Sequence, residues 1–153
     1  MRSRLLGIFF GGAIFSYVLD RLTKLWVERS LAARPPVHLI PHVLDLRYTT
    51  NTGGAFGVLG SQPWLFFTAT VLVSVIILVA AFRITSATTI LGMGLILGGA
   101  LGNLTDRVLH GPGVSGRVTD FIDFRVWPVF NLADSAIVVG ALIVAVAGMR
   151  RRT

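Results

Sequence analysis

Four stretches of the chain consist almost entirely of apolar residues, and more polar segments separate them. They cover residues 5–19, 63–82, 88–104 and 131–149. A helix needs about 20 apolar residues to cross the hydrocarbon core of a bilayer, so each stretch predicts a transmembrane helix. The first and third stretches are short, and we therefore expect polar residues close to the membrane boundary at their ends. The first helix is expected to continue past Asp20.

A different pattern follows the first apolar stretch. Apolar residues alternate with polar ones between Val43 and Tyr48, and the glycine-rich sequence NTGGAFGVLG comes after them. A period of two residues is typical of a β-strand with one covered face. We therefore expect a small β-sheet on the outer membrane surface beside the four helices.

The composition supports a membrane protein. Hydrophobic residues make up 54% of the 153 residues and charged residues 14%, and the mean hydropathy is +0.76. A soluble domain carries roughly 25% charged residues. The length predicts one integral membrane domain over residues 1–153. The N-terminal stretch also resembles a signal peptide, but no small-x-small cleavage site stands directly before Asp20, so we expect a retained span.

The net charge of +7 comes from basic residues at the ends of the apolar stretches. No Lys/Arg-rich run with interleaved aromatic residues occurs, so we expect no nucleic-acid binding. Six basic residues lie on the side of the two termini and eight on the other side, which leaves the orientation open by the positive-inside rule. The clusters at residues 2–4 and 150–152 are tight and close to the span ends. They favour cytoplasmic termini, with segments 20–62 and 105–130 outside.

The sequence offers little for a metal or cofactor. It has no cysteine, which excludes disulfides and thiolate chemistry. His38 and His42 have a spacing that suits zinc on one helical face. Pro35, Pro36 and Pro41 surround them and argue against a helix there. We expect no metal and no cofactor.

Polar residues gather at the outer ends of the predicted spans, a depth at which ionisable residues are costly and mark functional sites. They are Asp20, Arg21, Lys24, Asn103, Asp106, Arg107, Asp120, Asp123, Asn131 and Asp134. Structural roles are an alternative for several of them. Asp20 and Lys24 are four residues apart and can pair on one helix. The polar residues at 103, 106 and 107 share a helical face, so they either pair with one another or hold a polar substrate.

Asp134 has two interpretations. Asn131 is the expected N-cap of the fourth helix, and a carboxylate three residues later completes a capping box. The local sequence favours this capping role. The alternative is a carboxylate pair, because the break at residues 127–128 lets the chain fold back and bring Asp120 or Asp123 to Asp134. Two adjacent carboxylates cannot both ionise, and they share a proton as in aspartic proteases. Spacing does not choose between Asp120 and Asp123.

Five motifs in order carry a resemblance to a known family. They are Asp20-x3-Lys24, NTGGAF at 51–56, GNLTDR at 102–107, VTDFIDF at 118–124 and FNLADSAI at 130–137. The chain resembles lipoprotein signal peptidase (signal peptidase II), the bacterial intramembrane aspartic peptidase. The resemblance covers essentially the whole chain. The segment LHGPGVSGR at 109–117 departs from it, being longer and richer in glycine.

The resemblance implies a fold and a site. The fold is that of an all-α membrane protein, with four transmembrane helices, a small extracytoplasmic β-cradle and a short surface helix. Asp120 and Asp134 match the catalytic pair. The positions that match substrate-binding residues are Asn51, Asn103, Arg107 and Asn131. The positions that match supporting residues are Asp20, Lys24, Asp106, Gly53, Gly102 and Ala133.

The resemblance also implies an activity and its partners. The reaction is hydrolysis of one peptide bond in a prolipoprotein, just before a cysteine that carries a diacylglyceryl group, by water that the aspartate pair activates. The other expected partners are membrane lipids and, as inhibitors, cyclic peptide antibiotics. We expect the protein to be a monomer. The implied location is the bacterial cytoplasmic membrane, with the active site at its extracytoplasmic surface.

Two rival functions predict different features. A transporter or ion channel would place charged residues deep within the spans, whereas the middle of every span here is uncharged. A non-catalytic scaffold would use the carboxylates only as caps and ion pairs. It predicts that replacing Asp120 affects nothing beyond stability.

Overall fold

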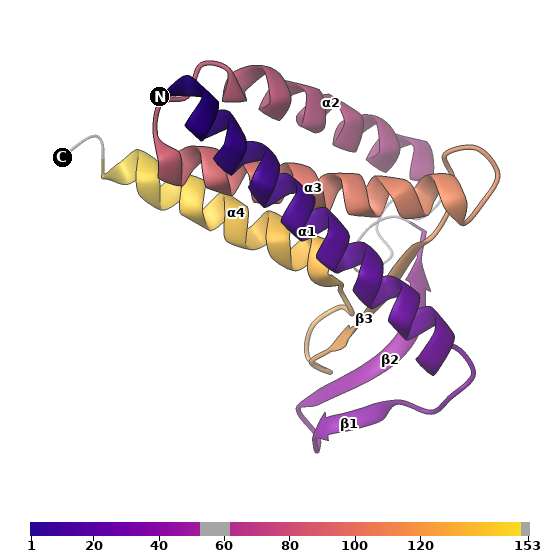
Figure 1. Cartoon of the computed structure of the whole chain (residues 1–153). Helices are drawn as coiled ribbons and strands as arrows, with labels where there is room; N and C mark the ends of the chain where they lie inside the picture. Colours follow the sequence, from indigo (N-terminus) through magenta and orange to yellow (C-terminus); the bar gives the residue numbers. More distant parts are fainter. Residues whose placement is uncertain (53–61, 151–153) are drawn as a thin grey trace.

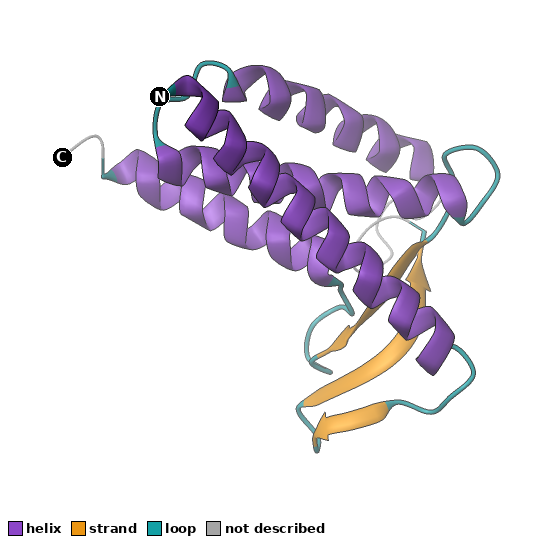
Figure 2. Cartoon of the chain, in the orientation of Figure 1, coloured by secondary structure: helices purple, strands orange, loops and turns teal. Residues whose placement is uncertain are grey.

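A computed structural model describes residues 1–52 and 62–150 as four long helices and a three-stranded sheet (Figure 1). The elements in chain order are α1 (Arg2–Leu31), β1 (Val37–Ile40), β2 (Leu44–Asn51), α2 (Pro63–Ala81), α3 (Ala87–Leu109), β3 (Val118–Asp123) and α4 (Leu132–Met149). All four predicted spans are helices, and each is long and apolar enough to cross a membrane. The sheet lies at one end of the helices, and the start of α1 and the end of α4 lie at the other (Figure 2).

Helix α3 is the centre of the bundle, because α1, α2 and α4 all pack against it. Small residues let the helices approach closely. A Cβ atom at Gly98 would collide with the carbonyl oxygen of Ala13 on α1. Phe9 and Ile90 are fully buried between these helices. In contrast, α2 and α4 leave most of their apolar side chains exposed, as expected of helices that face lipid.

Helix α1 is longer than a membrane span. Its 30 residues correspond to about 45 Å, against about 30 Å for the hydrocarbon core. The prediction that this helix continues past Asp20 is confirmed. Its last turns carry Val27 and Leu31, which pack on Phe121 of β3. The end of α1 therefore holds the sheet against the bundle.

The sheet is antiparallel with the order β1-β2-β3. The strand predicted over residues 43–48 is confirmed as β2, whereas β1 and β3 were not predicted. Strand β3 pairs with β2 so that Asp120 lies opposite Thr49 and Val118 opposite Asn51. The implied short surface helix is not among the elements of residues 1–52 and 62–150.

The chain folds back between β3 and α4, as the break at residues 127–128 predicted. Ile122 and Phe130 exchange backbone hydrogen bonds of 2.8 and 3.1 Å, and the rings of Phe124 and Phe130 stack. The glycine-rich segment 109–117 also folds back, since the N–H of Gly116 donates to the carbonyl of Arg107 at 3.0 Å. These two returns place β3 beside the ends of α3 and α4.

Candidate active site

The two aspartates of β3 point to opposite faces of the strand, because they are three residues apart. Asp120 is 3% exposed and lines a cavity that Asp134 also lines. Asp123 does not line this cavity. It pairs with Arg47 at 2.7 Å and accepts the backbone N–H of Arg125. The fold thus brings Asp120, not Asp123, to the aspartate of α4.

Asp134 completes the predicted capping box. Its N–H donates to the side-chain oxygen of Asn131 at 2.9 Å, and its Oδ2 accepts the N–H of Asn131 at 3.3 Å. Its Oδ1 accepts a second hydrogen bond, at 2.8 Å, from the amide of Asn103. The capping prediction is therefore confirmed. The same carboxylate also borders the cavity, so the two interpretations of Asp134 are compatible.

Asn131 connects the two aspartates. It is fully buried, and its Nδ2 lies 2.7 Å from Oδ1 of Asp120, 3.1 Å from Oδ1 of Asn103 and 3.2 Å from the carbonyl of Thr119. Its own oxygen receives the N–H of Asp134. One amide thus fixes the position of Asp120 relative to the first turn of α4.

Lys24 determines how the amide of Asn103 is turned. The buried ammonium group donates to Oδ1 of Asn103 at 2.9 Å. An ammonium group can only donate, so the oxygen of this amide faces Lys24 and its NH₂ faces Asp134. The orientation of the hydrogen bond to Asp134 is therefore set from α1.

A buried ion network surrounds Lys24. Asp20 and Asp106 each lie 2.9 Å from its Nζ, which confirms the predicted pair between Asp20 and Lys24. Asp106 also pairs with Arg21 and accepts the N–H of Thr119 at 3.1 Å. Charged groups buried in this way need close partners. The network joins α1, α3 and β3 behind the cavity.

Gly102 and Ala133 fit around Asp20. The N–H of Ala133 donates to Oδ1 of Asp20 at 3.0 Å, and a Cβ atom at Gly102 would collide with Oδ2. The three residues therefore pack α1, α3 and α4 together at this depth. Gly53, the remaining predicted supporting residue, lies outside the described residues.

The polar residues at 103, 106 and 107 have separate partners rather than one another. Arg107 extends to the cavity, where its guanidinium lies 3.4 Å from the carbonyl of Thr52 and 5.6 Å from the ring centre of Phe66. Asn51 lines the cavity too, and its side chain hydrogen-bonds Asp120. Asn51 and Arg107 therefore both belong to the wall of the cavity.

The cavity has a volume of about 230 Å³. Its polar wall consists of Asn51, Asn103, Arg107, Asp120 and Asp134. Val118 of β3 also lines it, and the loop between β3 and α4 supplies the rest. The loop residues are Trp127, Pro128, Val129 and Phe130, which were not predicted as site residues. An apolar cavity of about 500 Å³ adjoins it and shares Trp127, Phe130 and Asp134. In the sequence, the mostly apolar residues between the motifs at 118–124 and 130–137 could have indicated that this loop belongs to the site.

The surroundings of Asp120 favour its protonated form. Burial raises its pKa to about 7, and the nearby charge of Asp134 adds to this effect. The hydrogen bond from Asn131 opposes the shift without cancelling it. Near neutral pH Asp120 can therefore still carry a proton, as a group that takes part in acid–base chemistry must.

Comparison with known proteins gives consistent matches. The family model for signal peptidase (SPase) II matches residues 12–150. A lipoprotein signal peptidase from Pelotomaculum thermopropionicum is 43% identical over 84% of this chain and 82% of its own length. One from Rhodococcus jostii is 40% identical over 94% of this chain and 72% of its own length.

Two solved structures share the fold. One, described as a bacterial membrane enzyme determined by the in meso method at 2.3 Å resolution, has a TM-score of 0.81 and 27% identity, and the match covers 96% of this chain and 90% of that one. Another bacterial membrane enzyme, determined at 1.9 Å, has a TM-score of 0.78 and 28% identity over 92% of each chain. The sequence and structural matches agree, and the chain belongs to the signal peptidase II family of membrane proteases.

Proposed function

We propose that this protein removes the signal peptide from diacylglyceryl-modified prolipoproteins, cutting just before the lipidated cysteine, with Asp120 and Asp134 as the catalytic pair. The observation that carries the proposal is the shared cavity of these two carboxyl groups, with Asn131 connecting them. Membership of the family supports the substrate class. No metal or thiol is needed for this chemistry, because a carboxylate pair can both take and give a proton.

The contacts favour different roles for the two aspartates. Asp134 accepts N–H groups from Asn103 and Asn131 and lies in the first turn of α4. Donors and a helix N-terminus both stabilise a carboxylate. Asp120 is still partly protonated near neutral pH, because burial raises its pKa to about 7. We therefore assign Asp134 as the general base and Asp120 as the general acid.

The proposed reaction has two steps. Asp134 takes a proton from water as the water oxygen attacks the carbonyl carbon, and Asp120 gives its proton to the carbonyl oxygen. The resulting diol then collapses. The C–N bond breaks, Asp134 passes its proton to the leaving amine, and Asp120 recovers a proton from a diol hydroxyl. Both aspartates return to their starting states, and a carboxylic acid and an amine leave the site.

The remaining polar residues form two groups, those that line the cavity and one that is buried behind it. Asn51, Asn103 and Arg107 line it, and we assign them to contact with the substrate backbone. Asn131 is fully buried, so we assign it to holding the aspartate pair in place. The adjoining apolar cavity beside Asp134 would accommodate the acyl chains of the substrate. An acylated substrate could thus remain in lipid while its peptide bond enters the polar cavity.

We further propose that a single copy of the protein works in the bacterial cytoplasmic membrane, with its termini in the cytoplasm and the sheet outside. The basic residues at the termini favour this orientation. A prolipoprotein exported across that membrane would present its lipidated cysteine at the sheet end. Cyclic peptide antibiotics would act as inhibitors by occupying the polar cavity.

The test is a gel-shift cleavage assay on purified protein in detergent with a diacylglyceryl-modified prolipoprotein. Asp120→Asn and Asp134→Asn should each lower the rate at least 10²–10⁴-fold, the usual contribution of general acid–base catalysis. Asp123→Asn is the matched control from the same strand and should cleave at close to the wild-type rate. The wild-type kcat/KM should also fall about tenfold per pH unit above about pH 7, as Asp120 loses its proton.

The alternative is that the carboxylates serve only as caps and ion pairs, which the capping box at Asp134 favours. Circular dichroism and thermal unfolding of each variant separate the two functions. A folded Asp120→Asn protein that cleaves normally would refute the catalytic pair. If Asp123→Asn is inactive instead, the pairing with Asp134 is assigned to the wrong residue.

A further inference from the structure

The two ends of the helix bundle differ in their charged residues. All seven acidic residues of the chain lie at the sheet end, together with eight of the fourteen basic residues. The opposite end has no aspartate or glutamate. It carries Arg2 and Arg4 at the start of α1, Arg83 between α2 and α3, and Arg150 after α4. No aspartate or glutamate side chain is therefore available to pair with the arginines of this end, which leaves them open to an external anion.

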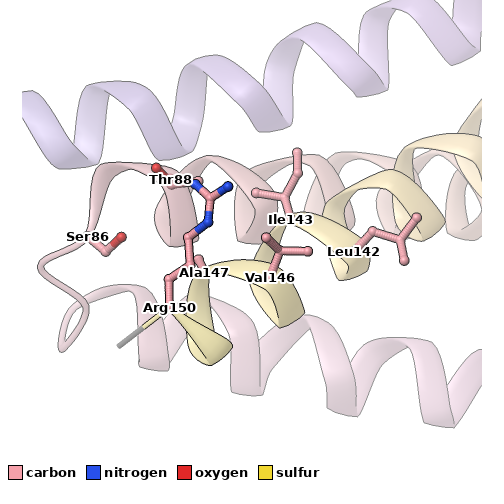
Figure 3. A pocket seen from close by; sticks show the side chains of 7 residues that line it. All are labelled: Ser86, Thr88, Leu142, Ile143, Val146, Ala147 and Arg150. Carbon is pink, nitrogen blue, oxygen red and sulfur yellow. The ribbon is translucent and has the colours of Figure 1, made fainter. Parts of the chain in front are cut away.

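A cavity of about 470 Å³ lies at this end, between the start of α3 and the end of α4. Its α4 wall is apolar and consists of Leu142, Ile143, Val146 and Ala147. Ser86 and Thr88 line it from α3, and Arg150 completes it. In Figure 3 the guanidinium group of Arg150 extends toward the start of α3 while the apolar side chains follow α4 away from it. The cavity is thus positively charged near Arg150 and apolar along its α4 wall.

We propose that this cavity binds one anionic glycerophospholipid, with its phosphate at Arg150 and an acyl chain along α4. A guanidinium group forms paired hydrogen bonds to phosphate oxygens. Thr88 is exposed and can donate its hydroxyl proton to the same phosphate. Ser86 can donate as well, because its Oγ is an acceptor in its bond with the N–H of Thr89. These three groups would bind the polar headgroup of the lipid.

The apolar wall selects a lipid rather than a free phosphate. Leu142 is 60% exposed, and it belongs to a helix that has the length and composition of a membrane span. An acyl chain of the surrounding bilayer can therefore lie on Leu142 and Val146 without leaving the hydrocarbon region. An anionic headgroup is favoured over a zwitterionic one, because none of the chain's aspartate or glutamate side chains lies at this end to offset its arginines.

The proposed lipid site is separate from the aspartate pair. Thr88 and Asn103 are fifteen residues apart on α3, which corresponds to about 22 Å. The inference does not depend on the proposed catalytic mechanism. Lipid binding and cleavage can fail or succeed independently in the same preparation.

Native mass spectrometry of delipidated protein in detergent tests the site. Phosphatidylglycerol and phosphatidylcholine with identical acyl chains would be titrated against wild type, Arg150→Gln and the matched control Arg83→Gln. Arg83 is at the same end and does not line the cavity. Arg150→Gln should raise the dissociation constant of the first bound phosphatidylglycerol about fivefold. This is equivalent to the ~1 kcal/mol that one arginine contributes near an anionic surface. Arg83→Gln should bind it as wild type does.

The acyl-chain contact has its own test. Ala147→Phe fills the cavity and should lower phosphatidylglycerol binding, whereas Ala141→Phe on the exposed side of α4 should not. Equal affinity for the two lipids, or unchanged binding by both Arg150→Gln and Ala147→Phe, would overturn the proposal. Full displacement of the lipid by equimolar glycerol phosphate would also overturn it, since the acyl chain would then contribute nothing. Cleavage measured on each variant should stay at the wild-type rate.

Discussion

Two networks of charged side chains meet at β3. One is completely buried; in the other, called the exposed network here, the two arginines are open to solvent although the aspartates they pair with are buried. The buried network joins Lys24 to Asp20 and Asp106 at 2.9 Å each. The exposed network lies on the outer part of the sheet and contains Arg47 with Asp123 at 2.7 Å and Arg125 with Asp45 at 2.6 Å. The distances are nearly equal, but the side chain of Arg47 is 44% exposed whereas that of Lys24 is completely buried.

The difference shows that burial, not distance, decides what an ion pair contributes. Removing one member of a buried pair leaves an uncompensated charge in a low-dielectric interior and is strongly destabilising. An exposed pair is screened by water and contributes little. The buried network is also the one that orients Asn103 toward Asp134. Its integrity therefore matters for both folding and the geometry of the cavity.

The largest expected effect is that of Lys24→Met. Asp20 and Asp106 would then face each other in the interior without the ammonium group between them. We expect a loss of about 3–5 kcal/mol in the free energy of unfolding, measured by denaturant titration in detergent micelles. The matched control is Arg47→Met in the exposed network. Equal losses in the two variants would contradict the role given to burial.

Opposite pH dependences should distinguish Asp120 from Asp45. The pKa of Asp120 is raised to about 7, so its contribution to stability is full below its ordinary value of 3.8 and is lost as the pH rises toward 7. The slope is at most about 1.4 kcal/mol per pH unit for one proton. The hydrogen bond with His38, followed by contact with Arg125, lowers the pKa of Asp45. Its contribution is present above the ordinary aspartate range and is lost as the pH falls.

The measurement compares the unfolding free energy of wild type with Asp120→Asn and Asp45→Asn from well below pH 3.8, where Asp45 becomes protonated, to pH 8. The decline with rising pH should be smaller in Asp120→Asn than in wild type, because this carboxyl no longer titrates. Asp45→Asn should keep the decline that Asp120 causes. Its free energy of unfolding should be lower than that of wild type at high pH, and this difference should shrink as the pH falls below 3.8. A decline that persists unchanged in Asp120→Asn would mean that another group causes it.

A smaller loss is expected from Gly102→Ala. The added methyl group would collide with the carboxylate of Asp20 and displace it from Lys24. Overpacking of this kind typically costs about 1–3 kcal/mol. Gly7 on α1 is the control, because a Cβ atom there would have no neighbour within 4 Å. Gly7→Ala should therefore be neutral or stabilising. Thermal unfolding of the two variants gives the comparison, and a stable Gly102→Ala would show that Asp20 can shift freely.

The smallest effect should follow Arg125→Gln in the exposed network. Its guanidinium contacts Asp45 at 2.6 Å but remains open to solvent. We expect a loss below about 1 kcal/mol that shrinks further in high salt, as for other exposed pairs. Unfolding at low and high ionic strength measures it. A salt-independent loss of several kcal/mol would place this pair with the buried network instead.

Local patterns predicted the parts of the fold that local sequence determines. The four spans, strand β2 and the capping box at Asn131 followed from hydropathy, alternation and cap spacing. Strand β3 was not predicted, because nearly all of it is buried and the alternation of apolar and polar residues is therefore missing. The contact between Lys24 and Asn103 joins residues 79 positions apart. No periodicity records such a contact. Spacing along the chain therefore did not distinguish Asp120 from Asp123, whereas the family resemblance and the fold do.

The unbroken course of α1 has a mechanical consequence. One rigid rod carries Phe9 in the bundle core, Lys24 at the ion network and Leu31 under the sheet. Each added residue would turn everything beyond it by about 100° and advance it by 1.5 Å. The length of α1 therefore fixes the height of the polar cavity above the bilayer midplane. A thicker bilayer, which helices meet by changing their tilt, would move the sheet and the cavity together as one piece.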